Sequence, residues 1–258
     1  MSQKSATFDE VSHLPAGYAY LREQAIRYNP QHPPLMKEIS ALPLLFLDLH
    51  YPDNPPDNEW IFGREFLFSQ DARQILFLGR IPAVFLSTVM ALLVMLWATK
   101  LWGKAGGLLA LCLYAFDPTI AAHSQLVTTD VGVACFSVLY LWCLRAYLQN
   151  PSWKRVLYSG LSLGLALGTK FSAVILIPVT LLLFAISAFK NAATEGAVAE
   201  GVSSRSNLIK SRQQWNSVGS YLAAFGFMMG LAVIFVWAIY FFPKDPLFYW
   251  KGIQAVNR

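Results

Sequence analysis

The most constraining feature of this chain is a series of long apolar segments without a charged side chain. Residues 81–99 and 217–242 are the clearest examples. A helix needs about 20 apolar residues to cross the hydrocarbon core of a bilayer. Only 14% of the 258 residues are charged, whereas soluble domains have about a quarter. The sequence therefore predicts an all-α fold, a polytopic transmembrane helical bundle.

We predict about six spans, and the positions of Lys and Arg orient them. The predicted spans are 81–99, 105–122, 125–148, 156–169, 171–189 and 217–242. Most of the Lys and Arg residues near the spans lie in alternate loops: Lys100, Lys104, Arg145, Lys154, Arg155, Lys190, Arg205, Lys210 and Arg212. Cytoplasmic loops are enriched in these residues, so we expect a multi-pass protein of the cell (inner) membrane. The N-terminal region, the loop from His123 to Asp130, the turn at Lys170 and the tail then face the periplasm or lumen.

The predicted organisation has three parts. Residues 1–78 form an outer-face loop, residues 79–242 form the bundle, and residues 243–258 begin a further outer-face segment. The stretch 190–216 is predicted to be a flexible cytoplasmic linker, because it is rich in Ala, Gly, Ser and charge. Apolar residues recur at helical spacing on both sides of the turn at 29–34. We expect two short amphipathic helices there that lie in the membrane interface.

Two adjacent carboxylates, Asp9 and Glu10, stand at the head of the first of these helices. Adjacent residues of a helix do not share a face, so we expect one working and one supporting carboxylate. A carboxylate that is partly desolvated at a membrane surface has a raised pKa and can serve as a general base. The alternative is an acidic residue that caps the helix, which is common at this position. The residues alone leave both interpretations open.

Further ionisable residues are predicted at the same face of the membrane. Asp130 opens an apolar helix after His123, and it is either a helix cap or a site residue, since ionisable groups at membrane depth are usually functional. Lys170, Arg80 and Lys37 are cations on the face where positive charge is disfavoured. Together they suit an anion such as a lipid phosphate.

Several other kinds of chemistry lack their sequence signals. The chain has no phosphate-binding loop, no glycine-rich dinucleotide fingerprint and no HExxH motif. Cys112, Cys135 and Cys143 lie inside apolar segments without metal-ligand spacing. The basic residues are scattered between apolar segments, which does not suit a nucleic-acid partner. We therefore expect no tightly bound cofactor, and the need for a divalent metal stays open.

Five motifs occur in an order that resembles one family. They are Asp-Glu-x-x-His-x-x-x-Gly-Tyr at 9–18, Asn-Pro-x-His-Pro-Pro-Leu-x-Lys at 29–37, Gly-Arg-Ile-Pro at 79–82, His-Ser-x-Leu-Val-Thr-Thr-Asp at 123–130, and Gly-Leu-Ala-Leu-Gly-Thr-Lys-Phe-Ser at 164–172. This set resembles the dolichyl-phosphate-mannose protein mannosyltransferase-like family of GT-C glycosyltransferases, including bacterial-type relatives. The resemblance runs from Asp9 to Ser172.

The resemblance implies a reaction and roles for the site residues. A sugar would pass from a polyprenyl phosphate in the membrane lipid to a protein, lipid or glycan acceptor at the outer face. Asp9 matches the acidic residue taken as general base, with Glu10 beside it. The matched motifs also place substrate-binding residues at His13, His32, Lys37, Arg80, His123, Asp130 and Lys170.

The chain departs from the family pattern at both ends. Family members have a span before the Asp-Glu motif and further helices after the last span found here, so we expect this chain to be a fragment. Two alternatives to an active enzyme remain: a transporter or flippase-like protein, and a catalytically inactive fragment or scaffold. A transporter tends to show internal repeats, and none is visible in this sequence.

Overall fold

The computed structural model describes residues 5–199 and 218–256, and all regular elements in these residues are helical. An outer group consists of the short helices α1 (Phe8–Glu23), α2 (Leu35–Ala41), η1 (Leu42–Phe46) and α3 (Glu59–Phe68). The remaining elements are α4 (Ala72–Phe116), α5 (Pro118–His123), α6 (Asp130–Gln149), α7 (Trp153–Leu167), η2 (Phe171–Ile175), α8 (Leu176–Ala199), α10 (Val218–Ile239) and α11 (Phe248–Ala255). This confirms the prediction of an all-α bundle.

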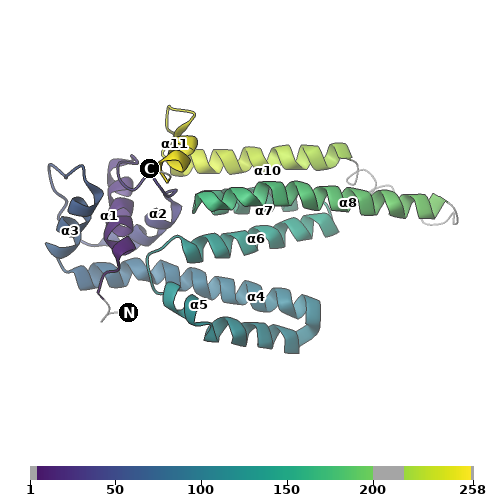
Figure 1. The fold of residues 1–258 in the computed structure, drawn as a ribbon, viewed down its shortest axis with the longest axis horizontal. Helices are drawn as coiled ribbons and strands as arrows, with labels where there is room; N and C mark the ends of the chain where they lie inside the picture. The colour runs from purple at the N-terminus through teal and green to yellow at the C-terminus, as the bar shows by residue number, and fades with distance from the viewer. Residues whose placement is uncertain (1–4, 200–217, 257–258) are drawn as a thin grey trace.

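Four helical segments of the described chain are long and apolar enough to cross a membrane: Ala72–Phe116, Asp130–Gln149, Phe171–Asn191 and Gly219–Ile239. The first supplies two of the predicted spans, because Gly103 interrupts it at φ 75° and ψ −175°, a conformation that favours glycine. Figure 1 shows α4 turning back on itself as a hairpin. The chain is thus a multi-pass membrane protein.

Three predicted spans differ from the structure in length. The span predicted at 105–122 ends at Phe116, because Asp117 caps the separate short helix α5. The span predicted at 156–169 corresponds to α7, whose 15 residues are fewer than the roughly 20 needed to cross alone. Helix α7 packs between α6 and α10, and Ser159 and Leu163 are buried. The span predicted at 125–148 begins at Asp130 instead, because the backbone just before α6 is drawn into contacts with α1.

The segments predicted for the outer face gather at one end of the bundle. In Figure 1, helices α1, α2, α3, α5 and α11 lie at that end, and the turns at Gly103 and at 150–152 lie at the other. The two sets of loops therefore separate as the charge pattern predicted. Which end faces the cytoplasm stays a prediction. Of the predicted linker, residues 190–199 continue α8, and residues 200–217 lie outside the described part of the chain.

Helix α1 differs from the amphipathic interfacial helix that we expected. It is enclosed by α2, α3 and α4, and Leu14, Ala19 and Tyr20 have no exposed surface. The approach is close: a Cβ on Gly17 would lie 2.1 Å from the backbone oxygen of Lys37. Of the polar residues of α1, Glu10, Ser12 and His13 are buried, whereas Asp9, Arg22 and Glu23 stay exposed. The second predicted helix fits better, because η1 exposes apolar side chains, with Phe46 90% exposed.

Helix α3 was not predicted, and it closes the outer group. Asn58 caps it by accepting hydrogen bonds from the backbone N–H groups of Trp60 and Ile61. Its inner face packs against the N-terminal core, where Phe62 stacks on Tyr28 with ring centroids 4.5 Å apart. Aromatic pairs of this kind stabilise the fold by more than the burial of their apolar area alone. The result is an outer core that holds α1 and the following loop in place.

Candidate active site

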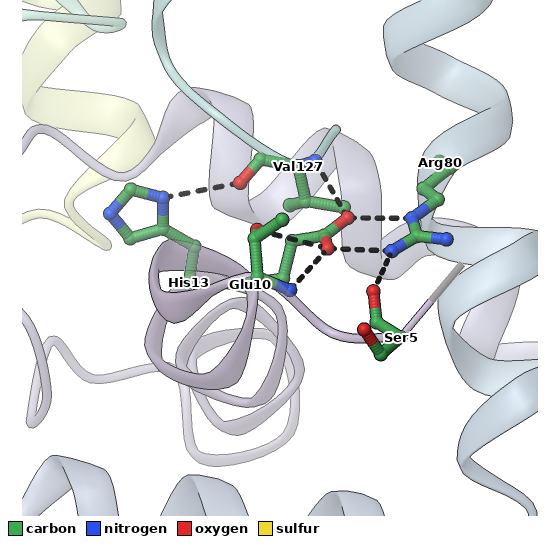
Figure 2. Close-up of polar contacts among 6 residues, drawn as sticks. Ser5, Glu10, His13, Arg80 and Val127 are labelled. Atoms are coloured by element: carbon green, nitrogen blue, oxygen red, sulfur yellow. Dashed lines mark hydrogen bonds and ion pairs between the residues drawn. The ribbon is translucent and has the colours of Figure 1, made fainter. Parts of the chain in front are cut away.

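A buried ion pair between α1 and α4 organises the outer end of the bundle. The Nε and Nη2 atoms of Arg80 each donate to a different oxygen of Glu10, both at 2.7 Å, and neither side chain has exposed surface. The same carboxylate accepts from the backbone N–H of Val127 at 3.2 Å and from the N–H and hydroxyl of Thr7 at 2.9 and 3.0 Å. Figure 2 shows Glu10 at the centre of these contacts. One side chain thus joins α1, α4 and the loop before α6.

The hydrogen bonds decide the charge of Glu10. Burial raises the pKa of the carboxyl, but the bonds from Arg80, Thr7 and Val127 outweigh it and hold the pKa below its ordinary value of 4.5. Glu10 is therefore ionised at neutral pH and fully committed to protein donors. Arg80 also donates to the backbone oxygen of Ser5 at 3.0 Å.

Asp9 differs from Glu10 in its exposure and in its hydrogen bonds. Its side chain is exposed, and no hydrogen bond or ion pair to it occurs among the described residues. It is not the helix cap, because Thr7 occupies that position. Its charge acts on the imidazole of His32, whose pKa it raises against the stronger effects of burial and nearby lysines. Asp9 is thus an exposed carboxylate whose charge reaches His32.

His13 and His32 lie edge to face, with ring centroids 5.5 Å apart. His13 is 5% exposed, and its Nδ1 lies 3.3 Å from the backbone oxygen of Val127. Burial, helped by Lys37 and His32, lowers the pKa of His13 to about 3, so the ring is neutral. Because a carbonyl only accepts, we assign the ring proton to Nδ1, which leaves Nε2 as an acceptor. Burial also lowers the pKa of His32.

Lys170 and Asp130 form an ion pair at the mouth of the bundle. Their Nζ and Oδ1 atoms are 2.7 Å apart, with side chains 31% and 48% exposed. His123 lies on the other side of Asp130, 3.9 Å away. The helix cap of α6 is Thr129 rather than Asp130. Asp130 therefore makes its contacts with the neighbouring ionisable residues.

An apolar cavity of about 300 Å³ adjoins this ion pair. It lies between the two arms of α4, helix α5 and the start of α6, and its lining includes Met90, Tyr114, Ile120, His123, Asp130 and Val131. The polar end of the cavity is thus the end at which His123 and Asp130 stand. A molecule with an apolar chain and a charged head would match this distribution.

Comparison with known protein families decides the assignment. The family model described as dolichyl-phosphate-mannose-protein mannosyltransferase matches residues 53–199, more than half of the chain. The chain belongs to this family. Its members are membrane glycosyltransferases of the GT-C type that act on lipid-linked sugar donors. Searches of curated proteins and of solved structures find no match.

The matched range covers α3 to α8 and so contains only some of the predicted site residues. It includes Arg80, His123, Asp130 and Lys170, and it begins after Asp9, Glu10, His13, His32 and Lys37. The structure brings the two groups together. The backbone N–H of Leu35 donates to the oxygen of Gly168 at 3.1 Å, which joins the start of α2 to the turn that carries Lys170.

The predicted site residues of this glycosyltransferase fall into two layers. The outer layer contains exposed or partly exposed side chains: Asp9, His32, His123, Asp130 and Lys170. His13 is 5% exposed and belongs with the buried residues. The inner layer contains Glu10, Arg80 and Lys37, with exposures of 0, 0 and 1%. The side chains of the inner layer are committed to protein partners.

Sequence reasoning missed the residues that support the site. Asn29 has a left-handed backbone with φ 47°, and its side-chain amide donates to Ser12 at 2.8 Å. Tyr20 accepts from Lys37 at 3.1 Å. The only available signal was the Asn29-Pro30 pair, since Asn tolerates this backbone better than most residues. In the described part of the chain, no three His, Cys, Asp or Glu side chains group as metal ligands.

Proposed function

We propose that this chain transfers a sugar from a polyprenyl-phosphate donor to an acceptor at the outer, periplasmic or lumenal face of the membrane, with Asp9 as general base. Membership of the family supports the glycosyltransferase class. The observation that supports the rest is the exposed carboxylate of Asp9, which has no hydrogen-bond or ion-pair partner among the described residues and whose charge acts on His32, at the end of the bundle where Lys170 and Asp130 also lie.

The donor would place its phosphate near Lys170 and its chain along the apolar cavity. Lys170 uses one of its three N–H groups on Asp130, so two remain for phosphate oxygens. The cavity beside Asp130 has apolar walls and adjoins the membrane-spanning part of α4 and α6. A cation at this position stabilises the charge that develops on the leaving phosphate.

The reaction balances without a further reagent. The acceptor hydroxyl or amine attacks the anomeric carbon, and Asp9 takes the proton that the acceptor loses. The bond between the anomeric carbon and the phosphate oxygen breaks, and the phosphate leaves with the electron pair. Attack from the side opposite the phosphate inverts the anomeric centre. No tightly bound cofactor is part of this proposal, because the lipid phosphate itself is the leaving group.

The buried residues support this step by position. The Glu10–Arg80 pair fixes the first turn of α1, which carries Asp9, against α4. The same carboxylate holds the backbone of Val127, whose oxygen orients His13. His13 is neutral, so its free nitrogen is suited to accept a hydrogen bond from a hydroxyl of sugar or acceptor. Preorganised groups of this kind reduce the reorganisation that the transition state requires.

The test uses membranes that contain the full chain and a defined donor. Membranes are incubated with a polyprenyl phosphate that carries a labelled sugar, and acceptors are identified by mass analysis of protein, lipid and glycan fractions. We expect label in one fraction, and none when a nucleotide sugar replaces the lipid-linked donor in membranes depleted of polyprenyl phosphate. Membranes without the chain provide the background. Label that follows the nucleotide sugar directly would contradict the proposed donor, and solute uptake without sugar transfer would indicate a transporter.

A further inference from the structure

We propose that Lys37 is a positioning residue that holds the Asn29–His32 loop and so sets where His32 stands against His13 and Asp9. This inference rests on the proposed function for its kinetic consequence, although the contact itself does not. The family resemblance predicted a phosphate-binding role for Lys37. The structure instead places the ammonium group inside the protein, 1% exposed, beneath the loop.

The contacts of Lys37 all converge on this loop and on α1. Its Nζ donates to the backbone oxygen of Asn29 at 2.6 Å, to the side-chain oxygen of Asn29 at 3.0 Å and to the backbone oxygen of His32 at 2.9 Å. It also lies 3.1 Å from the hydroxyl of Tyr20. Both ends of the loop segment are thereby bonded to one atom.

The other hydrogen bonds of the loop hold its Asn29 end, so Lys37 provides the hydrogen bond at the His32 end. At the Asn29 end, the amide side chain donates to Ser12 at 2.8 Å and the backbone N–H donates to Glu59 at 2.6 Å. Gln31 also donates to Glu59, at 3.0 Å. For His32, the contacts found are the bond from Lys37 to its backbone oxygen and the ring contact with His13. Loss of the Lys37 bond would therefore free the position of the His32 ring.

The hydrogen bonds between Lys37 and the loop require the charged form of the lysine. The Tyr20 hydroxyl donates its own hydrogen to the backbone oxygen of Tyr28, so all four neighbours of the Lys37 nitrogen act as acceptors. An ammonium group offers three donors, whereas a neutral amine offers two and turns a lone pair toward an acceptor. Burial lowers the pKa of Lys37 to about 7, opposed by the charges of Glu59 and Glu38. The loop should therefore loosen as the pH rises through this value.

Among the titratable groups near Lys37, Glu38 also titrates in the range of the test, because burial raises its pKa to about 8. The Lys37→Met variant keeps Glu38 and therefore separates the two effects. The groups that face it are Tyr20 and His13 on α1, His32 on the loop, Glu59 on α3 and the neighbouring Glu38. Burial and Lys37 lower the pKa values of both histidines below 6.5, so both rings are already neutral at pH 7. Burial raises the pKa of Tyr20 well above 10.0. A change in His32 reactivity between pH 6.5 and 8.5 would therefore report the loop rather than protonation of the ring.

The first experiment measures loop position without enzyme activity. The full chain in membranes is treated with diethylpyrocarbonate, and modification of His32 is followed by peptide mass spectrometry, with the exposed His50 as internal reference. Wild type should show slow modification of His32 that accelerates above pH 7. Lys37→Met should modify fast at every pH, and Lys251→Met, which removes an exposed lysine of α11, should behave as wild type. Equal His32 rates in wild type and Lys37→Met would overturn the inference.

The second experiment separates positioning from phosphate binding. Lys37→Met should lower the turnover of sugar transfer by about tenfold or more, because small misplacements of site residues have effects of this size, with donor KM within about twofold. In a His32→Ala background the same substitution should have little further effect, since residues that act through one another are non-additive. A raised donor KM with unchanged His32 labelling would indicate a phosphate contact and overturn the inference. Faster labelling in a chain that transfers no sugar would instead refute the proposed function and leave the loop contact standing.

Discussion

Removal of one partner of the Glu10–Arg80 pair is expected to destabilise the protein strongly. Both side chains have no exposed surface, and two hydrogen bonds of 2.7 Å join them. Glu10→Gln keeps the shape of the side chain but leaves a buried guanidinium without its counter-charge. Breaking a buried pair in this way costs about 3–5 kcal/mol. With about 2–4 °C of midpoint shift per kcal/mol for a chain of this size, the thermal midpoint should fall by about 6–20 °C.

The chain offers a matched control for this prediction. Arg27 and Asp57 form an ion pair with a similar distance of 2.6 Å, but the Asp57 side chain is 95% exposed. Asp57→Asn should hardly change the midpoint, because exposed pairs are screened by solvent. The assay is thermal unfolding of purified protein in detergent, followed by the loss of monodisperse protein. A Glu10→Gln midpoint no lower than that of Asp57→Asn would refute the reasoning that burial determines the value of the pair.

The double variant and the pH dependence give two further checks of the same pair. Glu10→Gln with Arg80→Met should cost less than the sum of the single substitutions, because the second change removes the charge that the first left unpaired. The pKa of Glu10 is lowered from 4.5 in the folded protein. Its contribution is therefore fully present above about pH 4.5 and is lost as the pH falls through the folded value. Additive costs would contradict the pairing.

Three other substitutions test the site and its packing. Gly17→Ala should destabilise the protein by about 1–3 kcal/mol or more through overpacking, because the added Cβ would lie 2.1 Å from a backbone oxygen of α2. Gly226→Ala is the control: a Cβ there has no neighbouring atom within 4 Å, so the same thermal unfolding assay should show no change. Lys170→Met should raise the donor KM at least severalfold while thermal stability stays nearly constant, because its ion pair with Asp130 is partly exposed; an unchanged KM would remove it from the donor site. The pKa of His13 is lowered from 6.5 to about 3, so His13 makes stability independent of pH above 6.5 and lowers it by about 1.4 kcal/mol per pH unit as the pH falls from 6.5 toward 3. His13→Gln should reduce that slope in unfolding measured between pH 6 and 4, and an unchanged slope would contradict the buried neutral ring.

The bundle was predictable because membrane spans are local in sequence. Each span is a continuous apolar segment, and the loops alternate in Lys and Arg content, so both the helices and the two ends of the bundle follow from residue order. The turn inside α4 was also placed between two predicted spans, although its basis in the backbone of Gly103 became visible only in the structure. What failed were the lengths of the spans at 105–122, 125–148 and 156–169, because caps and contacts with neighbouring segments set where these helices begin and end.

The outer group was harder to predict because its contacts are long-range. A helix with Asp9, Glu10, Arg22 and Glu23 resembles a surface helix, and nothing local indicates that Glu10 meets Arg80, 70 residues later. The different surroundings of Asp9, which is exposed, and Glu10, which is buried, did follow from helical geometry, since adjacent residues point in different directions. Which of them works in the reaction stays a prediction. The burial of Lys37 could not be predicted from the sequence, because the acceptors that surround its ammonium group come together only in the folded chain.

The central claim is that Asp9 removes the proton of the acceptor during sugar transfer from a lipid phosphate. The most direct measurement compares initial rates of transfer from a polyprenyl-phosphate sugar for wild type, Asp9→Asn and Asp53→Asn, at equal amounts of membrane-inserted protein. Asp53 is also exposed and lies in the loop before α3, so its substitution controls for loss of a surface charge. We expect a loss of about 100-fold or more for Asp9→Asn, in the range of general-base catalysis, and a rate near wild type for Asp53→Asn. A rate for Asp9→Asn within twofold of wild type would contradict this claim.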